Sequence, residues 1–545
     1  MEMRSKLRPL TSTRLVMLFS LCLVLFYNLA TWHALVGLTQ LQGIKAGAFY
    51  LSFGLFLWAA ITLLLTPFSF RPTLKPVLSL VAPGSAAAAY FMNTYGISID
   101  TTMMQNVLET NPGEAQDLLS GKLFMYLGLL GVLPTALIWL IPVTYRRVLP
   151  GLINKLLVCA GCVVVIVACV GTFYSTYAPI FRDEDKLTHF INPTNYLYAI
   201  GKLTKQTLAI KQTVTVQTVG ADAALGAQAR QRPKKSLMIF VVGETARADH
   251  FSLNGYARDT NPELKQQDIL NFTQVSSCGT STAVSVPCMF SKFPRTEYSD
   301  KKGKTYEGLL DMLQRAGLKV LWLDNNSDCK GACLRVPHSD IPKNQPSPFC
   351  DGQNCLDESL LVGLQAYIDS LQDNAIIVLH SDGSHGPEYY ERYPQTLERF
   401  TPVCHTNQLG SCTSDELKNV YDNTILYTDH FLAQTIELLK RNQDKVDTSM
   451  IYVSDHGESL GESGIYLHAA PYAIAPTAQT HVPMVMWFGH STLQDASIDR
   501  NCLLAKQNQA DLSHDYLFHS VLGLLGVNST EYQPALDIFH SCRRG

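Results

Sequence analysis

The sequence lacks several features that would assign it to a common protein class. Its 545 residues carry 43 Lys and Arg against 46 Asp and Glu, a formal net charge of −3, so it has no basic footprint for a nucleic acid. We find no internal repeat. The first apolar stretch is too long and begins too late to be a cleaved signal peptide. These absences exclude a nucleic-acid partner and leave a strongly apolar first third of the chain to be explained.

Five apolar stretches occupy this first third. They lie at residues 15–35, 46–66, 77–95, 123–143 and 156–177, and each approaches or exceeds the ~20 residues that cross a bilayer. Pro83, Gly84 and Ser85 interrupt the third stretch, which is the weakest of the five. Their length and number argue against buried core helices. The sequence therefore predicts a five-helix transmembrane domain over residues 1–178, with a helical loop at 96–122 on the periplasmic side.

Positive charge in the short loops predicts the orientation of these helices. Basic residues precede the first stretch and lie in the second and fourth connections: Arg4, Lys6, Arg8, Arg14, Arg71, Lys75, Arg146, Arg147 and Lys155. Because Lys and Arg accumulate in cytoplasmic loops, the N-terminus is expected in the cytoplasm. Five spans then place everything after Tyr177 outside the cytoplasm.

The cysteines support the same location. Four of the 14 fall in the apolar stretches, and the other ten follow residue 236: Cys278, Cys288, Cys329, Cys333, Cys350, Cys355, Cys404, Cys412, Cys502 and Cys542. Their spacing is too irregular for a zinc ribbon, and an even, closely spaced set outside the cytoplasm indicates disulfides. Pairing of neighbours predicts the bonds 278–288, 329–333, 350–355, 404–412 and 502–542. The compartment is oxidising, which in a bacterium is the periplasm, so the chain is expected in the inner membrane.

The remainder of the chain alternates short apolar runs with helical patterns. Strands are expected at 237–242, 319–323, 375–379, 449–453 and 482–487, and helices at 305–316, 357–371, 416–442 and 513–525. This alternation is typical of a mostly parallel α/β sheet with helices on both faces, here in a domain spanning 236–545. Residues 179–235 form a connector, in which 195–211 is an amphipathic helix that either lies on the membrane surface or is an ordinary linker.

Two of the predicted strands end in residues that bind metals. Glu244 follows one strand, and Asp455 and His456 follow another. Open α/β sheets place their chemistry beyond the carboxyl ends of such strands, so the three side chains are expected at one edge. Mixed oxygen and nitrogen ligation suits Zn²⁺ or Mn²⁺ better than Mg²⁺ or Ca²⁺. The alternative is two unrelated loops with ordinary polar residues.

A hydroxyl-rich segment at 277–288 offers nucleophiles beside such a metal. Thr280, Ser281 and Thr282 lie in it, and metal coordination can activate a hydroxyl at neutral pH. The alternative is a capped Ser/Thr-rich loop. Ser285-Val286-Pro287 resembles the start of the sulfatase maturation motif, but Met289 stands where that motif has Arg, which disfavours a formylglycine sulfatase.

Two histidines and one lysine complete the candidate site. His385 follows the strand at 375–379, and His468 lies in the loop after His456. Lys330 lies between Cys329 and Cys333, where it would bind a phosphate oxygen as a point charge. A solvated lysine and structural histidines are the alternatives.

The motifs together resemble the lipid A phosphoethanolamine transferases, both the chromosomal enzymes and the mobile colistin-resistance enzymes. The resemblance covers essentially the whole chain and rests on Gly-Glu-Thr-Ala-Arg at 243–247, Cys-Gly-Thr-Ser-Thr-Ala at 278–283, Ser-Val-Pro-Cys-Met-Phe-Ser at 285–291, Gly-Ser-His-Gly-Pro at 383–387 and Ser-Asp-His-Gly-Glu-Ser at 454–459. It implies a catalytic domain of the alkaline-phosphatase/sulfatase superfamily. It also implies transfer of phosphoethanolamine from phosphatidylethanolamine to lipid A, which gives resistance to cationic peptides such as polymyxin.

The resemblance also implies roles for individual residues. Zn²⁺ would be bound by Glu244, Thr282, Asp455 and His456, and Thr282 would be the nucleophile, with Thr280 and Ser281 left as alternatives by spacing alone. His385 and His468 match positions that hold a second zinc or the phosphate, and either is a candidate acid. Phosphoethanolamine contacts are expected from Asn326 and Lys330, and lipid-donor contacts from Asn106, Thr110 and Glu114. The enzyme is expected to act as a monomer.

One position departs from the family pattern. Asp382 precedes Gly383 where an apolar residue is expected, and its carboxylate would recruit a second metal, raise the basicity of His385 or point to solvent. Other acceptors (core sugars or periplasmic glucans), a lipid phosphodiesterase and a metal-stabilised binding module stay open as alternatives. The sequence does not distinguish between the phosphates of lipid A.

Overall fold

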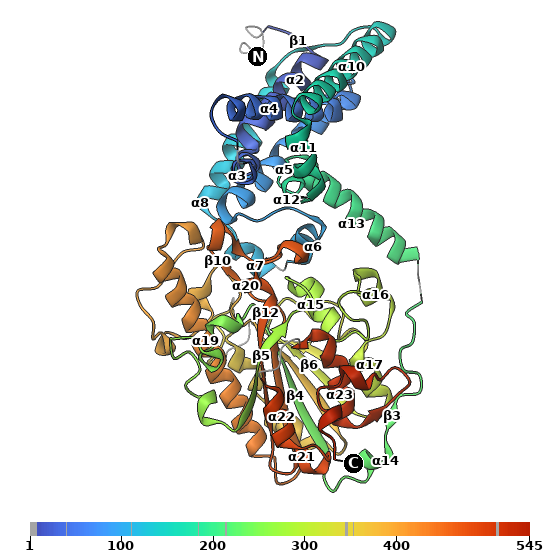
Figure 1. Ribbon diagram of the computed structural model, residues 1–545, viewed down its shortest axis with the longest axis vertical. Helices are drawn as coiled ribbons and strands as arrows, with labels where there is room; N and C mark the ends of the chain where they lie inside the picture. Colours follow the sequence, from blue (N-terminus) through green and yellow to red (C-terminus); the bar gives the residue numbers. More distant parts are fainter. Residues whose placement is uncertain are drawn as a thin grey trace. The chain divides into compact units, whose positions relative to one another are not determined.

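The computed structural model describes residues 8–39, 41–110, 112–183, 185–212, 215–343, 347–352, 354–507 and 512–544, without the side chains of 112–114, 179, 182–186 and 209–212. The chain forms two compact units (Figure 1). The helical unit comprises Met1–Met104 and Leu119–Leu203, and the sheet unit comprises Gln105–Leu118 and Thr204–Gly545. The short segment Gln105–Leu118 thus packs with the sheet unit, although its neighbours in sequence belong to the helical one.

The helical unit contains long apolar helices. Its main helices are α2 (Ser12–Cys22), which continues through η1 (Leu23–Tyr27), α3 (Leu29–Leu38), α4 (Gly43–Leu65), α5 (Leu74–Tyr95), α8 (Gly121–Tyr126), which continues through η3 (Leu127–Val132) into α9 (Leu133–Leu140), α10 (Val148–Thr172) and α13 (Thr194–Gln212). Within the described residues, three helices are long and apolar enough to cross a membrane: Gly43–Phe68, Gly121–Leu140 and Val148–Thr172. The pair Ser12–Tyr27 and Leu29–Leu38, bent by 63°, makes a fourth if it is one span.

The predicted number of five spans is therefore not confirmed. The third predicted stretch does fold as a helix, α5, but it contains Pro83 and polar residues such as Ser85 and Asn93. The first stretch is broken at Asn28. There the Asn28 side chain donates to the carbonyls of Leu23 (2.9 Å) and Asn192 (2.8 Å), which satisfies backbone groups where the helix is interrupted.

The sheet unit is built around an eight-stranded sheet with the order β13-β5-β12-β9-β4-β8-β6-β7. The strands are β4 (Ser236–Gly243), β5 (Ile269–Ser276), β6 (Lys319–Asp324), β7 (His338–Asp340), β8 (Ala375–His380), β9 (Asp447–Ser454), β12 (His481–Phe488) and β13 (Leu512–Ser513). Strand β12 is antiparallel to β5 and β9, and the other pairs are parallel. The mostly parallel sheet agrees with the prediction, which contained five of these strands and missed β5, β7 and β13.

Helices cover both faces of this sheet (Figure 1). They include α15 (Thr282–Met289), α17 (Leu309–Arg315), α18 (Leu364–Ser370), α19 (Ser414–Lys440) and α23 (Leu517–Leu525). Every residue of β4, β8 and β9 is buried, as expected for parallel strands with helices on each side. The buried centre leaves the carboxyl ends of these strands as the place where polar side chains can gather.

Five disulfides join the ten cysteines of the sheet unit, and they are the predicted pairs: Cys278–Cys288, Cys329–Cys333, Cys350–Cys355, Cys404–Cys412 and Cys502–Cys542. Four of them close loops of ten residues or fewer in sequence separation. The role of these four is local, because each closes a short loop, whereas Cys502–Cys542 joins residues 40 positions apart.

Candidate metal centre and active site

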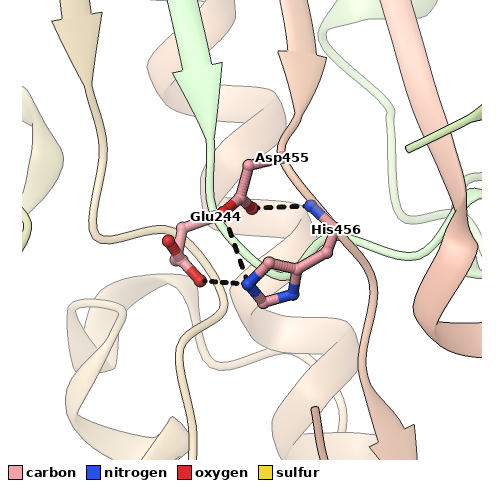
Figure 2. A group of neighbouring side chains, drawn as sticks. All are labelled: Glu244, Asp455 and His456. Carbon is pink, nitrogen blue, oxygen red and sulfur yellow. Dashed lines mark hydrogen bonds and ion pairs between the residues drawn. The ribbon is translucent and has the colours of Figure 1, made fainter. Parts of the chain in front are cut away.

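The register of two neighbouring strands brings the predicted metal ligands together. Strands β4 and β9 run in parallel with Gly243 opposite Ser454, so the next residues, Glu244 and Asp455, leave the sheet side by side. Figure 2 shows their side chains and that of His456 converging beyond the strand ends. One ligand atom from each lies within 4.8 Å of the others, and none of the three residues is more than 1% exposed.

The orientation of the His456 ring fits a cation. Its Nδ1 donates to the carbonyl of Gly457 (2.9 Å), which leaves Nε2 as an unprotonated nitrogen facing Glu244 Oε1 and Asp455 Oδ2, both at 3.3 Å. Burial and the neighbouring His468 lower the pKa of His456 well below its usual range, so the ring is neutral. A neutral lone pair facing two carboxylates is repulsive, and a metal ion between them would remove that repulsion.

Thr282 is the hydroxyl that reaches this cluster. It is the first residue of α15, and its Oγ1 donates to Glu244 Oε2 (3.1 Å) and lies 3.3 Å from His456 Nε2. Neither of the two alternatives from the sequence forms a hydrogen bond to this cluster in the described structure. Thr280 Oγ1 donates to the carbonyl of Ala470 (2.6 Å), and Ser281 Oγ is buried with no hydrogen-bond partner among the described residues.

Glu244 is held in place from both sides. Asn326 Nδ2 donates to Glu244 Oε2 and to the carbonyl of Ser381, each at 2.9 Å, and Asp324 fixes this turn by accepting from the Asn326 backbone N–H (2.9 Å). On the other side Gly383, at φ +53°, leaves no room for a side chain, because a Cβ there would lie 2.7 Å from the Glu244 carbonyl oxygen. Asn326 and Gly383 therefore position the carboxylate.

The two predicted histidines, His468 and His385, follow one another outward from the candidate metal ligand His456. The ring of His468 lies 4.5 Å from that of His456, and the ring of His385 lies 5.5 Å from that of His468, measured between centroids. His468 Nδ1 is 3.3 Å from Glu458 Oε2. Burial raises the pKa of Glu458, and burial with the neighbouring His468 lowers that of His385 well below its usual range. Glu458 belongs to the motif at 454–459, but nothing in that motif predicted its pairing with His468.

Lys330 lies on the loop closed by Cys329–Cys333, at φ +47°. Its Nζ donates to the carbonyl of Ser327 (2.6 Å) and to that of Glu109 (3.4 Å). Burial and His468 are the main causes of the lowered pKa of His385, and the charge of Lys330 adds to them. The bonds to Ser327 and Glu109 are to neutral carbonyls, and among the described side chains no carboxylate forms an ion pair with Lys330.

The segment Gln105–Leu118 carries the predicted lipid-donor residues. It contains Asn106, whose carbonyl accepts from Thr110 Oγ1 (2.7 Å), while the side chain of Glu114 lies outside the described part of the structure. Gln105 Nε2 donates to Asp300 Oδ1 (3.1 Å). At the other end of the segment, Asp117 forms an ion pair with Arg392 of the same unit.

Asp117 belongs to an ion-pair network that contains the unusual residue Asp382. Arg392, only 5% exposed at its side chain, lies 2.6 Å from both carboxylates, through Nη2 to Asp117 Oδ2 and Nη1 to Asp382 Oδ2. Its Nε donates to the carbonyl of His385 (3.0 Å). Asp382 therefore pairs with a buried guanidinium and joins the Gln105–Leu118 segment to the His385 turn. Nothing in the sequence indicated Arg392, because its partners lie 10 and 275 residues away.

Comparison with known proteins agrees with this architecture. The sulfatase family model matches residues 236–527, and the model named phosphoethanolamine transferase EptA/EptB matches residues 57–208. Phosphoethanolamine transferase EptA of Salmonella typhimurium is 41% identical over 534 residues, 97% of this chain and 96% of that protein. Phosphatidylethanolamine transferase Mcr-1 of Escherichia coli is 42% identical over 457 residues, 82% and 84% of the two chains.

Solved structures extend the similarity to three dimensions. The integral membrane protein lipooligosaccharide phosphoethanolamine transferase A (EptA) from Neisseria meningitidis superposes with a TM-score of 0.95, 37% identity and coverage of 99% of this chain and 100% of that one. These similarities confirm the resemblance seen in the motifs. The chain belongs to the phosphoethanolamine transferase family, with a helical membrane unit and a sulfatase-type sheet unit.

Proposed function

We propose that this protein transfers phosphoethanolamine from phosphatidylethanolamine to a phosphate of lipid A through a covalent intermediate on Thr282. The observation that carries the proposal is the position of the Thr282 hydroxyl, 3.1 Å from Glu244 Oε2 and 3.3 Å from His456 Nε2. The related Neisseria protein is named for a lipooligosaccharide acceptor, which favours a lipid A type of acceptor here. Masking phosphate charge with an ammonium group would weaken the binding of cationic peptides such as polymyxin.

Glu244, Thr282, Asp455 and His456 would hold one Zn²⁺, which suits a set of carboxylates, a hydroxyl and an imidazole. When bound, the metal supplies charge that lowers the pKa of a hydroxyl and offsets negative charge on a phosphoryl group. His385 and His468 would hold the phosphate or a second zinc ion. Burial raises the pKa of Asp455 to about 6, and a cation among these residues would favour its charged form.

The first half-reaction forms the bond between phosphorus and Thr282 Oγ1 and breaks the bond to the diacylglycerol oxygen. Thr282 donates a hydrogen bond to Glu244 Oε2, so that carboxylate is placed to accept its proton. The Glu458–His468 pair is placed to return a proton to the leaving alkoxide, since burial raises the pKa of Glu458. Lys330 and Asn326 would contact the phosphoethanolamine. In the second half-reaction a lipid A phosphate oxygen attacks the same phosphorus and releases Thr282.

The membrane arrangement follows from charge and disulfides. We place the catalytic domain, residues 236–545, in the periplasm and the connector, 179–235, at the membrane, since five disulfides need an oxidising compartment. We place five spans in the inner membrane within residues 1–178 and count α5 as the fifth. The Lys and Arg residues before the first span and in alternate loops place the N-terminus in the cytoplasm. The donor lipid would lie against Asn106, Thr110 and Glu114, and the enzyme would act as a monomer.

The test is intact-mass spectrometry of lipid A from a polymyxin-sensitive host. Cells expressing the wild-type chain should add phosphoethanolamine to lipid A, and cells expressing Thr282→Ala should not, with Thr282→Ser as the variant that keeps a hydroxyl. Metal analysis of the purified chain should find zinc in wild type and much less in Glu244→Gln. Transfer of phosphoethanolamine by the Thr282→Ala variant would refute the assignment of Thr282 as the nucleophile. If lipid A stays unmodified while diacylglycerol is released, the acceptor is a core sugar, a periplasmic glucan or water and not lipid A.

A further inference from the structure

The helical unit contains an apolar cavity that the transfer reaction does not use. Its volume is about 590 Å³, within the range of a lipid-sized or drug-sized ligand. It lies between the α2–η1 helix and α4. Five of its lining side chains expose between 43% and 68% of their surface: Leu18, Leu21, Leu25, Leu51 and Leu55. It is therefore a groove open to the surroundings of the helices, which in a membrane are hydrocarbon.

The aromatic residues of the groove have their polar atoms bonded inside the protein. Trp58 Nε1 donates to the carbonyl of Met17 (2.9 Å), and Trp32 Nε1 donates to the carbonyl of Val24 (3.1 Å). The hydroxyl of Tyr50 is hydrogen-bonded to Thr39 Oγ1 at 2.9 Å. These contacts occupy the polar atoms of all three rings, so the rings offer only carbon surface to the groove. Such a surface suits an acyl chain and not a polar ligand.

The same hydrogen bonds show that the groove runs along the α2–η1 helix. Trp58 meets α2 near Met17, and Trp32 meets the helix one to two turns later at Val24. Arg14, which is exposed, lines the end before Met17. From Arg14 to Leu25 the helix rises roughly 16 Å at ~1.5 Å per residue, about half of the ~30 Å hydrocarbon core. The groove therefore matches the depth of one leaflet and has a cation at one end.

We infer that this groove binds one acyl chain of an anionic phospholipid, with its phosphate at Arg14. The groove excludes polar ligands, and the guanidinium group selects a phosphate-bearing headgroup with net negative charge. The basic residues near Arg14 assign this end to the cytoplasmic side, so the lipid would belong to the cytoplasmic leaflet. It is a resident lipid, distinct from the donor consumed at the sheet unit, and the inference does not depend on the proposed reaction.

Gly54 offers a direct way to fill the groove. It lines the cavity, and a Cβ at this position would lie 3.3 Å from Trp32 Cη2. A leucine there would occupy the space beside the indole. Gly47 is the matched control, because it lies on the same helix, α4, with nothing within 4 Å of an added Cβ.

The experiment measures tryptophan quenching in bilayers. The full chain is reconstituted in phosphatidylcholine containing a small fraction of a phospholipid with brominated acyl chains, which quench tryptophan on contact. The signal from the groove is the difference between wild type and Trp32→Phe/Trp58→Phe. Brominated phosphatidylglycerol should quench this signal at about fivefold lower mole fraction than brominated phosphatidylcholine or phosphatidylethanolamine, as expected for one basic residue near an anionic headgroup.

The variants separate the headgroup from the acyl-chain site. Arg14→Gln should abolish the preference for phosphatidylglycerol while Arg14→Lys keeps most of it, and Gly54→Leu should abolish the groove signal while Gly47→Leu keeps it. Equal quenching by all three lipids in wild type, or a preference for phosphatidylethanolamine, would overturn the inference. So would a phosphatidylglycerol preference that survives Gly54→Leu. Unchanged thermal unfolding of each variant ensures that the fold is intact.

Discussion

Replacing Arg392 by methionine should destabilise the sheet unit in a way that depends on pH. Arg392 lies 2.6 Å from Asp117 Oδ2 and from Asp382 Oδ2, with side-chain exposures of 5%, 11% and 15% for the three residues. Methionine fills much of the same volume but leaves both carboxylates without their cation. Removing one partner of a buried ion pair costs about 3–5 kcal/mol, because the remaining charge stays desolvated.

The sign of the pH dependence follows from the carboxylates. Burial already raises the pKa of Asp117, and Arg392 opposes that shift. Burial and the charge of Asp382 raise the pKa of Asp357 to about 6. Without Arg392 the pKa of Asp117 rises further above its unfolded value, so the folded variant binds more protons than its unfolded chain. Its stability is then lost as pH rises through the folded pKa values, and the defect should be large near pH 8 and small near pH 5.

Thermal unfolding of the full chain in detergent measures this effect. Near pH 8 we expect the Tm of Arg392→Met to fall by roughly 6–10 °C. Arg399→Met is the control, since Arg399 is 52% exposed at its side chain and its 3.5 Å pair with Asp259 is at the surface, where ion pairs contribute about 0–1 kcal/mol. Adding Asp382→Asn to Arg392→Met should restore part of the loss. Equal shifts for the two arginines, or a shift independent of pH, would refute the reasoning.

Three further predictions concern the site and the fold around it. Gly383→Ala should lower zinc content and transfer at least tenfold, because its Cβ would lie 2.7 Å from the Glu244 carbonyl oxygen and displace that ligand. His430→Gln should lower the Tm near pH 6 and have little effect near pH 10. Ion pairs with Glu263 (2.8 Å) and Glu358 (3.4 Å) raise the pKa of His430 to about 9, so their stabilisation is complete below about 6.5 and disappears as pH rises through about 9. Chelation of bound metal should lower the Tm of the wild-type chain, since a ligand of the folded state stabilises it.

Each of these predictions has a control that isolates its cause. Gly363→Ala introduces a side chain at φ +75° where nothing lies within 4 Å of the Cβ, so it reports backbone strain alone; zinc loss equal to that of Gly383→Ala would reject the steric argument. A constant Tm difference for His430→Gln across the pH range would reject the ion-pair origin. If a chelator lowers the Tm of Glu244→Gln as much as the Tm of wild type, its effect does not come from removing metal at this site.

Local sequence patterns were sufficient to bring out the candidate metal ligands and the disulfides. Glu244 and the pair Asp455-His456 each end a short apolar run, and strands of this type place their carboxyl ends at one edge of a sheet. The structure shows that arrangement, with β4 and β9 adjacent. The disulfides were equally accessible, because four of the five pairs are ten or fewer residues apart. In each case the information lies within a few residues along the chain.

The elements that were missed carry weak local patterns. Strand β5 has the sequence Ile-Leu-Asn-Phe-Thr-Gln-Val-Ser and a mixture of buried and exposed positions, while β7 and β13 have only three and two residues. Their strand conformation depends on pairing with a neighbour already in the sheet. The predicted number of five membrane spans stays a prediction, because among the described residues three helices, or four with the bent pair, are long and apolar enough, and helix α5 matches a span in length but contains Pro83.

The sequence by itself determined the family and predicted the chemistry of the candidate site and the compartment, because motifs, charge and cysteine spacing are properties of neighbouring residues. Only the tertiary structure decided which hydroxyl faces the metal ligands, since Thr280 and Thr282 are two residues apart and point to different partners. Only it showed that Asp382 pairs with Arg392 and, through Arg392, with Asp117. The physical reason is that the direction of a side chain and the partner of a buried charge depend on elements 10 to 275 residues away, which strand register and helix packing bring together.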